Sequence, residues 1–94
     1  MPVAERELTE LVRKTCQEKG LLAYHTYDSR MSAPGFPDWV IIRHPVVHFL
    51  ELKTDRGRVS DPQREWAKGL RTCTSHKYRL FFGMAETERW LRSL

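Results

Sequence analysis

Two short apolar runs in the middle of the chain constrain its fold most strongly. Residues 39–42 and 46–52 are rich in β-branched and aromatic side chains, and each run has about the length of a strand. His44-Pro45 interrupts the pattern between them, and proline is disfavoured inside a paired strand. We therefore predict a β-hairpin, with Asp38 at the start of its first strand and Glu51-Leu52-Lys53 at the end of its second.

This hairpin would bring charged side chains together at one edge of a sheet. Alternation along a strand places Glu51 and Lys53 on one face with Val47 and Phe49, and the antiparallel return brings them back towards Asp38. Removing charges from water costs several kcal/mol per ion. The set would persist if a divalent cation bridged the acids and the lysine faced an anion. The alternative is a solvated Glu–Lys pair, because the tripeptide Glu-x-Lys is common.

The flanking segments predict helices and further strands. In residues 4–19, apolar positions recur with helical spacing, and Gly20 follows as a stop signal. Ser60 and Gln63 form a capping-box pattern around Pro62, which indicates the start of a second helix. The other predicted elements are a strand at 21–27, a loop at 28–37, the end of the second helix near 72–75, a strand at 77–82 and a helix at 87–94.

Composition narrows the classes of protein that the chain can belong to. Its 94 residues suit one domain, and no apolar stretch approaches the roughly 18 residues of a membrane span. With no signal-peptide pattern either, we expect a cytoplasmic protein. The net charge of +4 is compatible with a polyanionic partner. Cys16 and Cys73 lack zinc-ligand spacing and are expected to be buried free thiols on helices.

The central segment resembles a known family of nucleases. Pro37-Asp38 and Glu51-Leu52-Lys53 match the two halves of the PD-(D/E)xK motif. Four blocks in order, which extend the match to most of residues 5–82, resemble the VRR-NUC branch found in phages and repair nucleases. These blocks are YHTYDSR (24–30), PGFPD (34–38), ELK (51–53) and SDPQREW (60–66).

The resemblance implies a fold and an activity. The fold would be an α/β, restriction-endonuclease-like core in the order α-β-β-β-α-β-α, a mixed sheet flanked by helices within a single domain of residues 1–94. The activity would be metal-dependent hydrolysis of DNA phosphodiester bonds. Mg²⁺ or Mn²⁺ is the implied cofactor, because both prefer carboxylate and carbonyl oxygens.

The resemblance also assigns roles to individual residues. Asp38, Glu51 and the Leu52 backbone carbonyl would bind the metal, and Lys53 would orient or deprotonate the attacking water. Gln63 would lie next to Lys53 and face the scissile phosphate. Glu5 would bind a metal directly, through water, or at a second metal.

The helix-one acid has alternatives. Glu5 lies nearer the apolar face of the first predicted helix than Glu7, which is the second choice. Acids in a first helical turn also complement the helix dipole without any other role. The family pattern, with a glutamate early in helix one, favours Glu5.

Several further side chains are candidates for contact with the nucleic acid. Arg30 is a candidate phosphate clamp, and His25 a candidate for orienting water. Arg56 and Arg58 project from the charged loop 53–60, either into solvent or onto phosphates. The full set of predicted DNA-binding residues is Tyr24, His25, Ser29, Arg30, Arg56 and Arg58.

Small members of this family resemble Holliday-junction resolvases and structure-selective nickases. One active site cuts one strand, so paired cuts across a branched DNA predict a homodimer. The C-terminal helix and the strand at 77–82 are the candidate dimer surfaces. Two other classes compete: a non-catalytic nucleic-acid-binding module, and a structural domain with surface Glu–Lys pairs.

Overall fold

The computed structural model describes residues 5–26, 33–73 and 76–94, and their order of elements is the predicted α-β-β-β-α-β-α. The elements are α1 (Glu5–Lys19), β1 (Leu22–His25), β2 (Trp39–Arg43), β3 (Val46–Lys53), α2 (Asp61–Arg71), β4 (His76–Phe82) and α3 (Gly83–Ser93). Within these ranges no helix has both the length and the apolar character needed to cross a membrane.

The four strands form one mixed sheet in the order β1-β2-β3-β4. The predicted hairpin is confirmed: β2 and β3 are antiparallel, with Trp39 opposite Leu50, and a cis His44-Pro45 bond lies in the turn between them. β1 pairs antiparallel with β2, whereas β4 pairs parallel with β3 after the crossover through α2. The inner strands β2 and β3 therefore carry the PD and ExK segments.

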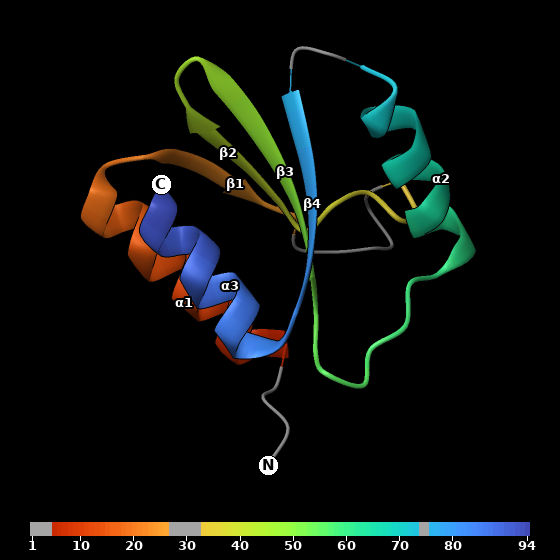
Figure 1. The fold of residues 1–94 in the computed structure, drawn as a ribbon, viewed down its shortest axis with the longest axis horizontal. Coiled ribbons are helices and arrows are strands. Elements are labelled where there is room, and N and C mark those ends of the chain that lie inside the picture. The colour runs from red at the N-terminus through yellow and green to blue at the C-terminus, as the bar shows by residue number, and fades with distance from the viewer. Residues whose placement is uncertain (1–4, 27–32, 74–75) are drawn as a thin grey trace.

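Helices lie on both faces of the sheet. Figure 1 shows α1 and α3 side by side on one face and α2 on the other. The first face carries the main core, in which burying each large aliphatic side chain contributes about 1.5–3 kcal/mol. This core fixes the end of β3 that bears Glu51 and Lys53. Its buried members are Leu8, Val12, Cys16, Trp39, Ile41, Leu50, Leu52 and Leu91.

The face under α2 is only partly covered. Phe36 joins α2 to the sheet, because its ring packs edge-on against Phe49 at 6.2 Å and against Trp66 at 5.0 Å. Farther out on β1, Leu22 is 75% exposed and Tyr24 60% exposed. α2 therefore covers the β3–β4 half of this face and leaves the β1 side open to solvent.

The last helix starts earlier than the predicted residue 87. Gly83 has φ +76, and α3 follows β4 there without a loop. The turn is fixed by Glu86, whose Oε2 accepts the Phe82 N–H at 2.8 Å, and by Thr87, whose hydroxyl donates to the Gly83 carbonyl at 2.8 Å. Gly83 thus joins strand to helix.

The prediction for the two cysteines is half right. Cys16 is buried on α1, as expected. Cys73 is exposed and lies beyond the helix on which it was expected, because α2 ends at Arg71 with Thr72 as its C-cap.

Candidate functional site

Asp38 lies directly before β2 and is held from two sides. Its Oδ2 accepts the Leu52 N–H at 2.8 Å, which ties the carboxylate to the end of β3. On the other side, the Thr26 N–H donates to the Asp38 carbonyl at 2.9 Å, and the Thr26 hydroxyl donates to the Pro37 carbonyl at 3.1 Å. Extending the β2–β3 register by one residue sets Asp38 opposite Glu51.

Glu51 is a buried carboxyl group with unsatisfied oxygens. It is 1% exposed, and among the described residues neither of its side-chain oxygens has a hydrogen-bond partner. Burial first, and the adjacent Asp38 second, raise the pKa of Glu51 to about 9, against the opposing charge of Lys53. Without a cation, Glu51 therefore keeps its proton at neutral pH.

Lys53 and Glu5 complete the charged set around Glu51. Lys53 is half-buried on the same face of β3 as Glu51, and a Cβ at Gly57 would lie 3.1 Å from the lysine Cβ and Cδ. Glu5 is exposed at the start of α1, and its charge also raises the pKa of Glu51. Of the two first-turn acids, Glu5 is the one whose charge contributes to the raised pKa of Glu51.

The donor set suits a hard divalent cation. The N–H and C=O of a strand residue point to the same side, so the Leu52 carbonyl faces the side from which Asp38 accepts the Leu52 N–H. No group of three or more His, Cys, Asp or Glu side chains arranged to hold a metal occurs within residues 5–26, 33–73 and 76–94. An ion bound here could use Asp38, Glu51 and the carbonyl, with Glu5 directly or through water, and Mg²⁺ commonly keeps several waters.

Gly35 seats the Asp38 loop directly on α2. Its φ is +79, and a Cβ at this position would overlap the Pro62 carbonyl carbon and the Gln63 nitrogen. The loop backbone can approach the helix this closely only because glycine has no side chain. The contact brings the first turn of α2 next to the segment that ends at Asp38.

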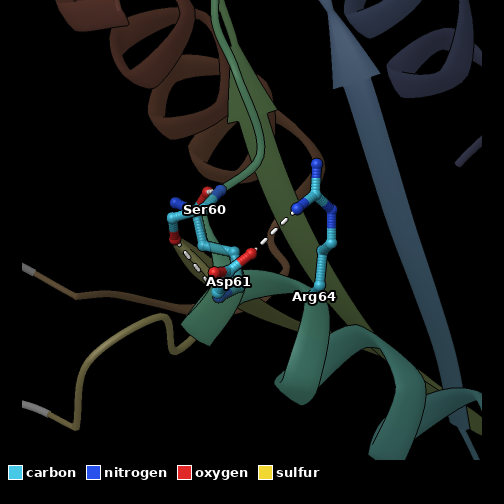
Figure 2. A network of polar contacts seen from close by, with 4 residues as sticks. Ser60, Asp61 and Arg64 are labelled. Carbon is cyan, nitrogen blue, oxygen red and sulfur yellow. Dashed lines mark hydrogen bonds and ion pairs between the residues drawn. The ribbon is translucent and has the colours of Figure 1, made fainter.

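The first turn of α2 is capped as the sequence predicts. The Ser60 Oγ accepts the Gln63 N–H at 3.3 Å, and the Gln63 Oε1 accepts the Ser60 N–H at 2.8 Å. Figure 2 shows Ser60 beside the ion pair of Asp61 and Arg64, which is 2.9 Å long. Capping uses the Gln63 side-chain oxygen, so the amide nitrogen, a donor, takes no part in the capping box.

Gly35→Ala is expected to lower the free energy of unfolding by about 2–5 kcal/mol. About 1–2 kcal/mol comes from the left-handed backbone and about 1–3 from the overlap with α2. Gly20→Ala is the matched control: Gly20 also has positive φ, but open space surrounds its missing Cβ. Urea denaturation checks both variants, and equal losses would contradict the close contact between Gly35 and α2.

The structure separates the candidate DNA-binding residues. Tyr24 pairs with Val40 on the face that carries Glu51, whereas His25 pairs with Trp39 on the opposite face and stacks on its ring at 4.8 Å. Burial lowers the pKa of His25, and Arg13 adds to the effect. Arg56 and Arg58 are both exposed after β3, whereas Ser29 and Arg30 lie outside the described residues.

The structure contains a basic cleft between α2 and β4 that was not predicted from the sequence. Its volume is about 820 Å³. The residues that line it are Arg58, Val59, Arg64, Ala67, Lys68, Arg71, Tyr78 and Leu80. The sequence carried one signal of it, since Arg64, Lys68 and Arg71 are spaced to share one face of a helix.

Comparisons with known protein families, curated proteins and solved structures find no match to this chain. The described residues establish a mixed α/β fold with a four-stranded sheet and three helices. The function must therefore be inferred from the chemistry of the site and from the motif that it carries.

Proposed function

We propose that this protein is a metal-dependent endonuclease of the PD-(D/E)xK type that hydrolyses DNA phosphodiester bonds with Mg²⁺ or Mn²⁺. One observation carries the proposal: Glu51 is almost fully buried beside Asp38, and both of its side-chain oxygens lack partners within the described chain. A purely structural position would favour an apolar residue or a satisfied carboxylate. A pKa raised strongly by burial and by a neighbouring charge is typical of functional sites.

A divalent cation would resolve the cost of this arrangement. It would bind Glu51 and Asp38 together and replace the proton that Glu51 otherwise holds. The remaining ammonium of Lys53 would then face an anionic ligand. Without a cation, the pair is stable only with Glu51 protonated, and a protonated glutamic acid contributes little to phosphate chemistry.

The metal, Lys53 and the start of α2 would each have a separate role at the scissile phosphate. A bound Mg²⁺ or Mn²⁺ would supply charge neutralisation and Lewis acidity at the scissile phosphate. Lys53 would orient the attacking water and offset charge in the transition state. The N-terminal turn of α2, with the Gln63 amide nitrogen, would hold the phosphate in place, since helix N-termini attract phosphate groups.

We also propose a preference for branched DNA, cut by a homodimer with one site per subunit. Of the two candidate dimer surfaces, α3 uses its apolar side chains inside the monomer: Leu91 is buried, and Trp90 contacts the rings of His48 and Phe81. β4 is the last strand of the described sheet, so its outer edge is the stronger candidate.

The proposal predicts cleavage of supercoiled plasmid and of a synthetic four-way junction in Mg²⁺ or Mn²⁺, and none in EDTA. The junction should be cut faster than a linear duplex of the same sequence. DNA binding without cleavage in any metal would instead identify a non-catalytic binding module. Neither binding nor cleavage would overturn both functions.

A further inference from the structure

The cleft between α2 and β4 is a concentrated source of positive charge. Three exposed cations of α2, Arg64, Lys68 and Arg71, share its wall with Arg58 from the loop after β3. No acidic side chain is among the described residues that line it. Its volume of about 820 Å³ is in the range of pockets that hold ligands of nucleotide size.

Little of this charge is neutralised inside the protein. Among the cations that line the cleft, Arg64 forms an ion pair within the described part of the chain, at 2.9 Å from Asp61. The Arg71 guanidinium lies over the Tyr78 ring, 5.0 Å from its centroid. Burial, and next the charge of Glu51, raise the pKa of Tyr78 to about 12, so its hydroxyl keeps a proton to donate to an anion.

The cleft begins beside the acidic site. Leu80, which lines the cleft, pairs with Glu51, and Tyr78 pairs with Phe49, so all four side chains share one face of the sheet. Neighbouring strands lie about 4.8 Å apart. A chain of phosphates that passes Glu51 therefore meets the cations of α2 within a short distance.

We infer that this cleft holds the phosphates of the DNA strand on one side of the scissile bond. The inference rests on the proposed function and extends it, because it assigns a strand path to Arg58, Lys68 and Arg71. A polymer fits better than a small anion, since the cations come from both α2 and the loop after β3, and Leu80 in the cleft pairs with Glu51. Arg56, by contrast, does not line the cleft.

The test compares two charge-matched double variants. K68Q/R71Q removes one lysine and one arginine from the cleft; K14Q/R89Q removes the same pair of residue types from exposed positions on α1 and α3. Binding of a fluorescein-labelled DNA duplex is measured by anisotropy in Ca²⁺, from about 50 to about 300 mM salt. The cleft double should bind about 10–100-fold more weakly, and its salt slope should fall by about 1.4–1.8, whereas the control slope should not change.

The outcomes separate this inference from the proposed function. If the wild type binds and cuts DNA but both doubles lose affinity and slope equally, only net charge matters and the cleft assignment is wrong. An unchanged slope in the cleft double also overturns it. A wild type that neither binds nor cuts DNA defeats the proposed function as well. Melting temperatures of both doubles within a few degrees of the wild type confirm that they are folded.

Discussion

Replacing Lys53 with alanine is expected to slow DNA cleavage by about 10²–10⁴-fold while changing DNA affinity little. The reason is position: Lys53 follows Glu51 by two residues on the same face, and its charge acts on that carboxyl group. Its positive charge would be needed most when negative charge builds up on the phosphate. Single-turnover cleavage in Mg²⁺ and anisotropy in Ca²⁺ measure the two quantities separately.

Two companion variants sharpen this result. Lys14→Ala removes an exposed lysine from α1 and should cut at the wild-type rate. Asp38→Asn keeps an oxygen to accept the Leu52 N–H but removes the charge, so both cleavage and Mn²⁺ binding in calorimetry should be lost. If Lys53→Ala cuts as fast as Lys14→Ala, Lys53 has no part in the mechanism.

The second large effect is expected on stability without metal. Glu51 has a raised pKa in the folded protein, from 4.5 to about 9, so between these values the folded state binds more protons than the unfolded state. The free energy of unfolding should therefore fall as pH rises through this window, by up to about 1.4 kcal/mol per pH unit from this group. Glu51→Gln has no titratable group at this position, so its plot of unfolding free energy against pH should lack this slope.

Urea denaturation of both proteins in EDTA, from about pH 5 to about pH 8, measures the difference. Groups other than Glu51 are common to the two proteins, so the difference between the curves isolates it. Adding Mn²⁺ at pH 8 should restore stability to the wild type, because only the folded state offers both carboxylates, and should do much less for Glu51→Gln. Parallel curves would show that Glu51 titrates normally.

The parts of the fold that the sequence predicted are set by local signals. The two apolar runs on either side of His44-Pro45 indicate the hairpin, and its register follows from the short turn. Ser60 and Gln63 indicate the start of α2 because a capping box involves residues only three apart. Asp38 and Glu51 come together because an antiparallel hairpin must bring its two ends together.

The features that the sequence did not reveal depend on distant segments. The start of α3 at Gly83, before the predicted residue 87, is one example, since a Cβ there would overlap the side chain of Asp55, which is distant in the sequence. The basic cleft needs Arg58 from one loop and Lys68 from a helix to meet, which follows from α2 packing over β4. No local pattern specifies that packing.

The close packing of the Gly35 backbone against α2 has a mechanical consequence. Main-chain atoms meet there with no side chain between them, so no rotamer change can absorb a displacement. A shift of the first turn of α2 would therefore also move the loop that ends at Asp38. In the proposed nuclease, a DNA strand bound along α2 would thus help to set the position of the Asp38 carboxylate.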